Sequence, residues 1–324
     1  MQRGTDTTLA ASVLARGGLV AFPTETVYGL GADATRPEAI AKVFAVKGRP
    51  AAHPLIVHVA PGAALDEYAR DVPASARALA SAFWPGPLTI ILKRGKRIAA
   101  EATGGSETVG LRVPSHPMAI ELLVKVGVPI AAPSANRFGR VSPTTADHVA
   151  ADLGDDIEYL LDGGACSVGV ESTIVDLSDA SAPALLRPGG VSRAELERVL
   201  AQPLGARTST PAPGTLPSHY APRARVIAVA PDQLASAARA AGARVAILAP
   251  HSVIAGAKLP PDLARIALPD APDAEARALY AALRELDARG VDTIIAALPA
   301  DTSGVAEAIA DRLRRAAGPR EDGT

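Results

Sequence analysis

Residues 19–33 read Leu-Val-Ala-Phe-Pro-Thr-Glu-Thr-Val-Tyr-Gly-Leu-Gly-Ala-Asp, and this stretch indicates the kind of fold to expect. Its apolar start, residues 19–22, predicts a buried strand, which runs directly into Thr24, Glu25 and Thr26. α/β folds place ligand contacts at such strand ends. The alternative is that the hydroxyl groups only complete a turn. The glycines also match a dinucleotide fingerprint, but we discount it because no ribose-binding acid follows on a second strand.

Strand and helix patterns mix in irregular order along the first 200 residues. Short apolar runs predict strands at residues 19–22, 54–59, 88–92, 108–113, 128–132, 157–161 and 173–177. Helical spacing of apolar residues predicts helices at residues 7–16, 37–46, 74–83, 117–126 and 144–153. This order predicts an α/β domain, residues 5–201, with a mixed, twisted sheet.

The character of the chain changes after Leu200. Residues 202–224 are rich in proline and glycine and predict a linker, because proline is excluded from helix interiors and central strands. Beyond it, strands are predicted at residues 225–229, 244–248, 265–268 and 293–297, and helices at residues 231–241, 273–288 and 303–317. Near-strict alternation predicts a parallel sheet in a small Rossmann-like domain, residues 225–318.

Composition narrows the classes of function. The chain has 324 residues, 48% of them hydrophobic, and a formal net charge of −1. No global field would draw it onto nucleic acid or an anionic membrane, so any contact with nucleic acid is local or indirect. The single cysteine, Cys166, argues against a zinc cluster and suits a reducing compartment. Neither a signal peptide nor a membrane-spanning stretch is predicted, and we expect a cytoplasmic protein.

Two cations follow the second predicted helix. Lys47 and Arg49 stand one residue apart before Pro50, in a turn that could aim both at one polyanion. The alternative is that they only complete a helix end, where cations are favoured. His58 lies within an apolar strand, where a satisfied core histidine is a better interpretation than a ligand contact.

Several later polar residues stand at strand ends or inside strands. Ser134 and Asn136 follow an apolar strand and could donate to phosphate or ribose, or merely form a turn. Arg112 lies in an apolar strand and needs an anion if buried, either an internal acid or a substrate carboxylate. Ser172 precedes a strand, and Arg187 precedes a turn.

Five segments together resemble the YrdC-type threonylcarbamoyl-AMP synthases in order and approximate spacing. They are Pro-Thr-Glu-Thr-Val-Tyr-Gly-Leu-Gly from Pro23, Lys-x-Arg from Lys47, Pro-Ser-Ala-Asn from Pro133, Glu-Ser-Thr-Ile-Val-Asp from Glu171 and Leu-Arg-Pro-Gly from Leu186. His219-Tyr-x-Pro222 resembles the linker element of the long, two-domain form of this family. Five ordered matches outweigh the structural alternative for each one.

The resemblance implies an enzyme that joins L-threonine, bicarbonate and ATP into threonylcarbamoyl-AMP and pyrophosphate, the first step of a tRNA modification. It implies Lys47 and Arg49 as catalytic residues. The implied ATP-binding residues are Lys47, Arg49, His53, Thr108, Ser134, Asn136, Ser142, Arg187, His219 and Tyr220. The implied L-threonine-binding residues are Thr26, His58, Arg112, Ala132 and Ser172.

The position of His53 departs from the family, in which Asn or another polar residue is common. The resemblance also implies magnesium bound through the ATP phosphates, no metal held by the protein itself, and a linker that closes over the active site. The product would pass to a separate tRNA threonylcarbamoyl transferase complex.

Two other functions stay open. One is a non-catalytic YrdC module that binds structured RNA. The other is carbamoyl transfer in hydrogenase maturation, whose proteins carry cysteine-rich zinc elements that a chain with one cysteine lacks. Threonine-dependent release of pyrophosphate would separate the enzyme from a pure RNA binder.

Overall fold

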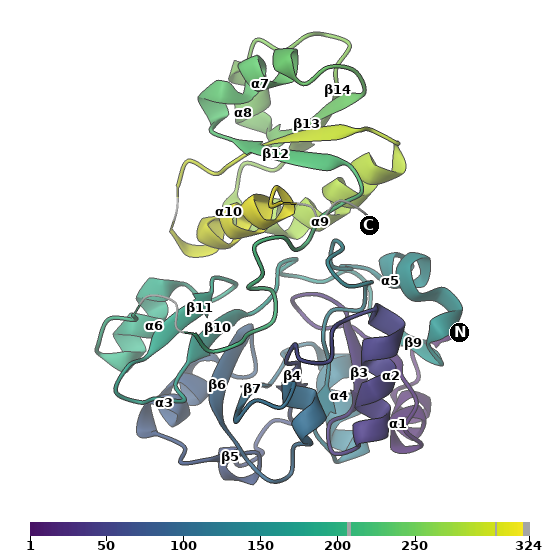
Figure 1. The fold of residues 1–324 in the computed structure, drawn as a ribbon, viewed down its shortest axis with the longest axis vertical. Coiled ribbons are helices and arrows are strands. Elements are labelled where there is room, and N and C mark those ends of the chain that lie inside the picture. The colour runs from purple at the N-terminus through teal and green to yellow at the C-terminus, as the bar shows by residue number, and fades with distance from the viewer. Residues whose placement is uncertain (206–208, 302, 320–324) are drawn as a thin grey trace. The chain divides into compact units, whose positions relative to one another are not determined.

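The computed structural model describes residues 1–205, 209–301 and 303–319, which form two compact units (Figure 1). Unit 1 comprises Met1–Phe138, Ser142–Ser167 and the described part of Glu171–Thr215. Unit 2 comprises Gly139–Val141, Val168–Val170 and the described residues from Leu216 onward. Each unit has its own sheet, as predicted for an α/β chain with a mixed sheet followed by a parallel one.

Unit 1 is built on a mixed sheet of eleven strands among the described residues, in the order β1-β9-β2-β3-β8-β4-β7-β6-β10-β11, with β5 paired to β6. Its strands are β1 (Gln2–Gly4), β2 (Val20–Phe22), β3 (Gly29–Asp33), β4 (Ile56–His58), β5 (Ala69–Arg70), β6 (Leu88–Arg94), β7 (Thr108–Arg112), β8 (Ile130–Ala131), β9 (Tyr159–Leu161), β10 (Thr173–Asp176) and β11 (Ala184–Arg187). β4 runs parallel to β7, and β6 runs parallel to β10, whereas β7 and β6 are antiparallel.

Helices bury the two faces of this sheet unequally. The main core contains buried residues of α2 (Pro37–Lys47), α3 (Ala74–Phe83), α5 (Ala146–Leu153) and α6 (Arg193–Leu200). A second core, made with β2 and β9, contains α1 (Thr7–Ala15) and α4 (Pro117–Val126), which pack on each other (Figure 1). Short 3-10 turns lie at Leu65–Glu67, Ala100–Thr103 and Gly154–Asp156.

The end of α2 positions the first cation. Gly48 caps the helix in the left-handed conformation, with φ of 62°, which glycine adopts without the steric cost of a Cβ. Lys47 is therefore the last helical residue, and the chain turns away immediately after it.

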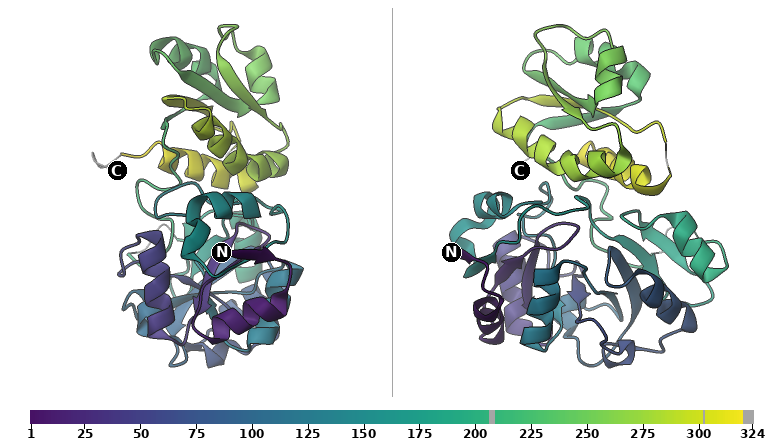
Figure 2. Two further views of the ribbon diagram at one scale, coloured as in Figure 1. Left: turned by 90° about the vertical axis from the view of Figure 1, so that its right-hand side faces the viewer. Right: turned by 180° about the vertical axis from the view of Figure 1, so that it is seen from behind.

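Unit 2 has an all-parallel sheet in the order β12-β15-β13-β14. Its strands are β12 (Arg225–Val229), β13 (Val245–Pro250), β14 (Ala264–Leu268) and β15 (Thr293–Ala297). Its helices are α7 (Leu234–Ala240), which follows a 3-10 turn at Pro231–Gln233, α8 (His251–Gly256), α9 (Pro272–Ala288) and α10 (Gly304–Ala316). α7 and α8 share a core on one face, and α9 and α10 lie together on the other (Figure 2).

The segment predicted as a linker, residues 202–224, has no helix or strand where the structure describes it, and residues 206–208 lie outside the described residues. The division between the units falls within it, after Thr215. On the unit 1 side, Pro213 O accepts a hydrogen bond of 3.0 Å from Arg187. On the unit 2 side, Leu216 O accepts one of 2.5 Å from Arg315. Each half of the segment is thus bonded to its own unit.

No helix in the described ranges combines the length and apolar character needed to cross a bilayer.

Candidate active site

Polar side chains form a row across five neighbouring strands of unit 1. His58, the last residue of β4, pairs with Arg112, the last residue of β7. On the next strands, Thr89 of β6 pairs with Ile174 of β10, which in turn pairs with Arg187 of β11. His58, Thr89, Arg112 and Arg187 are all buried, and none has more than 4% of its surface exposed. A buried polar row across a sheet is costly unless its members bond to one another or to a ligand.

An internal acid faces Arg112. Glu25 Oε1 accepts a hydrogen bond of 2.6 Å from Arg112 Nη2, and Glu25 Oε2 accepts one of 3.0 Å from the backbone N–H of Ser115. Arg112 Nε donates to Gly86 O over 3.3 Å. Among the described residues, no hydrogen bond from Arg112 Nη1 is found. The sequence left open an internal acid or a substrate carboxylate, and the internal acid is present, with one guanidinium nitrogen still available.

His58 is held in its neutral form. Burial, and then the positive charge of Arg112, lower the pKa of His58 to about 3. Its ring meets Phe22 edge to face, with 6.0 Å between ring centroids. A neutral imidazole here can exchange hydrogen bonds without adding a second cation beside Arg112.

Ser172 joins the row from the start of β10. Its hydroxyl lies 2.8 Å from Thr89 Oγ1, and Arg187 Nη2 donates to both its carbonyl and its hydroxyl, at 2.9 and 3.1 Å. The preceding residue, Glu171, accepts a hydrogen bond of 2.5 Å from Ser142. Thr89, Ser172 and Arg187 are therefore joined by hydrogen bonds, and the Ser142–Glu171 bond adjoins them through the chain at residues 171 and 172.

Lys47 ties the end of α2 to the loop after β8. Its ammonium group donates to Ser134 O and Asn136 O, both at 2.5 Å. The sequence placed it after the second predicted helix, but it is the last residue of α2 and only 2% of its surface is exposed. Burial, and secondarily the charge of Arg49, hold the pKa of Lys47 well below its usual 10.5. These contacts give Lys47 a structural role as well as a position beside two of the predicted ATP residues.

Arg49 and His53 meet at one aromatic ring. The guanidinium carbon of Arg49 lies 5.4 Å from the centroid of Phe138, and the His53 and Phe138 ring centroids are also 5.4 Å apart. Arg49 additionally donates to Pro54 O over 2.9 Å. Burial and the charge of Arg49 lower the pKa of His53. A guanidinium that lies over a ring and donates to a backbone carbonyl is restricted in the direction of its remaining N–H groups.

One predicted residue of each ligand set stands at an end of β7. Thr108 begins the strand and bonds to Ser106 over 2.9 Å, while Arg112 ends it, about 13 Å further along at roughly 3.3 Å per residue. No hydrogen bond in the described chain joins Thr108 to another predicted ATP residue. Between them is Gly110, where a Cβ would approach Thr89 Cγ2 to 3.1 Å.

Two other residues predicted to bind L-threonine, Thr26 and Ala132, are also buried. Thr26 has no exposed surface, and its hydroxyl lies 2.8 Å from that of Thr24, in the turn that also carries Glu25. Ala132 follows β8, and its N–H donates to Ile56 O over 2.9 Å.

His219 and Tyr220 belong to unit 2, where a cation and a second ring hold them. The two rings are 4.3 Å apart, Tyr220 stacks on Tyr280 at 6.0 Å, and the guanidinium carbon of Arg312 lies 5.1 Å from the Tyr220 ring. Tyr220 has φ of +61°, a conformation that a bulky residue rarely adopts. The surrounding contacts therefore determine this turn.

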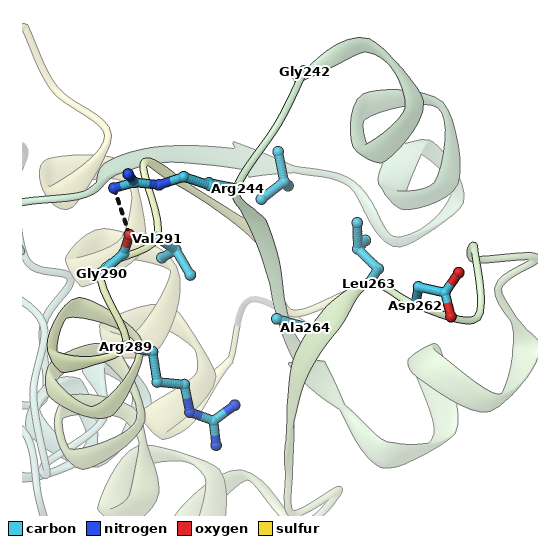
Figure 3. A pocket seen from close by; sticks show the side chains of 9 residues that line it. Gly242, Arg244, Asp262, Leu263, Ala264, Arg289, Gly290 and Val291 are labelled. Atoms are coloured by element: carbon cyan, nitrogen blue, oxygen red, sulfur yellow. Dashed lines mark hydrogen bonds between the residues drawn. The ribbon is translucent and has the colours of Figure 1, made fainter.

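A hollow of about 640 Å³ in unit 2 lies elsewhere, at the amino ends of three strands (Figure 3). Its two arginines already have acidic partners, Arg244 with Asp292 and Arg289 with Glu285. Parallel α/β sheets bind ligands at the carboxyl ends of their strands, so we assign no chemistry to this hollow.

Sequence reasoning missed some members of the site. Glu25 was noted only as part of a polar turn, Glu171 only as part of a motif, and Thr89 and Phe138 were not singled out. A threonine inside an apolar strand is typical of β-structure in general, so Thr89 gave no separate signal. Glu25 could have been found as the acid that a buried Arg112 requires.

Comparison with known families agrees with this geometry. The Sua5/YciO/YrdC family model, described as "Telomere recombination", matches residues 12–189, more than half of the chain. The chain belongs to the Sua5/YrdC family. A second model, "Threonylcarbamoyl-AMP synthase, C-terminal domain", matches residues 191–318.

The chain is similar to Sua5/YrdC proteins over nearly its full length. The threonylcarbamoyl-AMP synthase of Pyrococcus abyssi is 40% identical, with 96% of this chain and 94% of the relative covered. The synthase of Bacillus subtilis is 41% identical, with 96% and 92% covered. The crystal structure of P. abyssi Sua5 complexed with L-threonine has a TM-score of 0.88 at 39% identity, with 98% and 96% covered.

Proposed function

We propose that this chain is a threonylcarbamoyl-AMP synthase, an enzyme of the nucleotidyltransferase type that uses L-threonine and ATP. The observation that carries the proposal is the buried row of His58, Thr89, Arg112 and Arg187, on a sheet shared with synthases of about 40% identity. A non-catalytic RNA-binding module has no need of such a buried row, and relatives over nearly the full length favour the enzyme.

The reaction has two bond-forming steps. The amine of threonine combines with bicarbonate to give a carbamate and water. A carbamate oxygen then attacks the α-phosphorus of ATP, and the bond to the β-phosphate breaks to release pyrophosphate. Anions meet in this second step, so fixed cations and exact placement of the two reactants are the main contributions a protein can make.

The residues divide between the two reactants. Arg112 would bind the threonine carboxylate through Nη1, beside the neutral imidazole of His58 and the hydroxyls of Thr26 and Ser172. The backbone at Ala132 would complete the threonine-binding part of the site.

ATP would lie toward the start of β7. Its proposed contacts are Lys47, Arg49, His53, Thr108, Ser134, Asn136, Ser142 and Arg187, with His219 and Tyr220 contributed from the linker. Lys47 and Arg49 are proposed to act in catalysis, Arg49 by stabilising charge on the phosphates. Lys47 would hold the Ser134 and Asn136 loop in place.

Magnesium is proposed to bind through the ATP phosphates and water. Magnesium keeps several of its waters and is usually held through substrate phosphates rather than by an all-protein cage. Bicarbonate is the proposed source of the carbamate carbon, and a tRNA threonylcarbamoyl transferase complex the proposed recipient of the product. The one free, buried cysteine fits work in the cytoplasm.

The deciding experiment is pyrophosphate release by the full chain with ATP, bicarbonate and L-threonine. We expect release that depends on threonine, and an adenylate product of the mass of threonylcarbamoyl-AMP. Release that is absent, or equal without threonine, would refute the proposed function.

A further inference from the structure

Glu25 occupies a position that no substrate contact explains. It lies in the turn between β2 and β3, only 5% exposed, and each of its carboxylate oxygens has a different partner. Oε1 accepts from the guanidinium of Arg112, whereas Oε2 accepts from the N–H of Ser115, three residues further along the chain. Glu25 therefore holds both the side chain of Arg112 and the backbone that leaves β7.

The contacts of Arg112 leave one direction open. Glu25 takes Nη2 and Gly86 O takes Nε, so the plane of the guanidinium is fixed at two of its three nitrogens. A guanidinium is a rigid fork, and fixing two of its nitrogens determines where Nη1 points. A buried guanidinium without an anion is strongly destabilising, so Glu25 also makes the cation tolerable before a substrate carboxylate arrives.

The same turn carries a predicted substrate contact. Thr24 Oγ1 lies 2.8 Å from Thr26 Oγ1 and donates to Val27 O over 2.6 Å, which closes the turn on either side of Glu25. Because the carboxylate of Glu25 is bonded to Arg112 and Ser115, it fixes the position of Thr26 as well as that of Arg112.

We infer that Glu25 is a positioning residue for the amino-acid substrate: it orients Arg112 so that Nη1 meets the carboxylate of L-threonine. This inference rests on the proposed function and adds a residue to it. Because Gly86 O and Glu25 already accept from Nε and Nη2, Nη1 is the guanidinium nitrogen that meets the substrate carboxylate.

Glu25→Gln tests the inference, because it keeps the shape of the side chain and removes its charge and one of its two acceptors. Calorimetric titration of L-threonine into the full chain should show a dissociation constant raised on the order of tenfold. The KM for threonine should rise with it, while the KM for ATP and the kcat at saturating threonine change about twofold or less. Glu158→Gln is the matched control, because Glu158 also accepts a backbone N–H, from Leu19, far from Arg112 in sequence.

Other outcomes overturn the inference. Unchanged threonine binding would make Glu25 a purely structural residue, and tighter binding would mean that it competes with the substrate for Arg112. If Glu25→Gln does not fold, Glu25→Asp keeps the charge but shortens the reach, and it too should weaken threonine binding; unchanged binding would refute the inference. In an Arg112→Met background, Glu25→Gln should add less than twofold, since its effect acts through Arg112.

The inference and the proposed function can fail separately. A wild-type chain that binds threonine and releases pyrophosphate, with variants that bind as well as it does, overturns the role of Glu25 alone. A wild-type chain that neither binds threonine nor releases pyrophosphate overturns the function itself.

Discussion

Arg112 in unit 1 and Arg312 in unit 2 are both almost completely buried, with 4% and 1% of their surface exposed. The acid that pairs with Arg112 is Glu25, 87 residues away in sequence, and the two meet where other polar strand ends gather. The acid that pairs with Arg312 is its neighbour Asp311, and the guanidinium lies over the ring of Tyr220. Burial of a charge is thus common to both units, but its surroundings differ.

The difference teaches how to interpret a buried cation. In unit 1 the charges converge on a face where Arg112 retains an available nitrogen, as a binding site requires. In unit 2 the charge helps to hold a turn of unusual backbone conformation, Tyr220 with φ of +61°, against α10. Substitutions in unit 1 should therefore change ligand affinity or rate, whereas those in unit 2 should act through the His219–Tyr220 turn or through stability.

The largest effect is expected at the two cations at the end of α2, Lys47 and Arg49. Arg49→Ala and Lys47→Met should each reduce pyrophosphate release about a hundredfold or more, the typical loss when one group that stabilises developing charge is removed. Lys47→Met should also lower the melting temperature, because Ser134 O and Asn136 O lose a buried donor. Arg49→Ala should melt near wild type.

Lys42→Met, on the exposed side of α2, is the control for the loss of a lysine from this helix. Melting of Arg49→Ala far below wild type would favour the alternative that the two cations only complete a helix end.

The next effect concerns the turn in unit 2. His219→Ala with Tyr220→Ala should reduce synthesis of the adenylate by tens of fold, if the segment excludes water from a carbamate and a mixed anhydride that both hydrolyse readily. Pyrophosphate release measures the rate, and protease cleavage of the linker with and without ATP and L-threonine measures closure. Normal turnover with equal cleavage would leave the segment as a spacer.

The structure changes how a truncation should be designed. A cut after about Gln202, at the predicted boundary, would remove Pro213, which accepts a hydrogen bond from Arg187 in unit 1. A cut after Thr215 keeps unit 1 whole and should still greatly reduce synthesis.

The next effect in size is expected for Arg112→Ala. Its affinity for L-threonine should be lower by roughly ten- to a hundredfold, since a charged hydrogen bond contributes about 1.5–3 kcal/mol. ATP affinity should change much less. Titration of each substrate into the variant measures both. Loss of ATP binding with threonine binding intact would reverse the assignment of the two ends of β7.

Much of the fold was predictable because periodicity was strong. The predicted helices at residues 74–83 and 117–126 and strands at residues 225–229 and 293–297 match the observed bounds. β3 was missed because Gly29-Leu-Gly-Ala-Asp33 resembles a glycine loop. As a central strand it places the glycines of the apparent dinucleotide fingerprint inside β-structure rather than in a phosphate-binding turn. β1 was missed because Gln2–Gly4 is polar, and it takes its form from pairing with β9.

The site was predictable in its residue types but not in its contacts. The resemblance pointed to Arg112 and Lys47 but not to their partners. Arg112 meets Glu25, and Lys47 meets the carbonyls of residues 134 and 136. Both pairings depend on which strands become neighbours. That order, with β4 between β8 and β7, arises from long-range pairing and leaves no periodic trace in the sequence.

The smallest effect is expected at Glu275, in the first turn of α9. It is 3% exposed, and its Oε1 makes no hydrogen bond among the described residues. Burial, and then the negative charge of Asp270, raise the pKa of Glu275 from its usual 4.5 to about 7. The buried Glu25 of unit 1 forms an ion pair with Arg112, whereas no ion pair of the buried Glu275 is found among the described residues.

The sign of the pH dependence follows from that pKa. The folded chain binds the proton more tightly than the unfolded chain, so the stabilising effect of protonated Glu275 is complete below about pH 4.5 and is lost as the pH rises to about 7. Glu275→Gln cannot ionise, so at pH 8 its free energy of unfolding should exceed that of wild type by about 1–2 kcal/mol after solvent screening, and it should melt a few degrees higher. At pH 5 it should melt near wild type. Glu285→Gln is the control, because Glu285 lies on the same helix and pairs with Arg289. An equal difference at both pH values would show that Glu275 does not titrate in this range, and the contrast with Glu25 would then be one of packing rather than of charge.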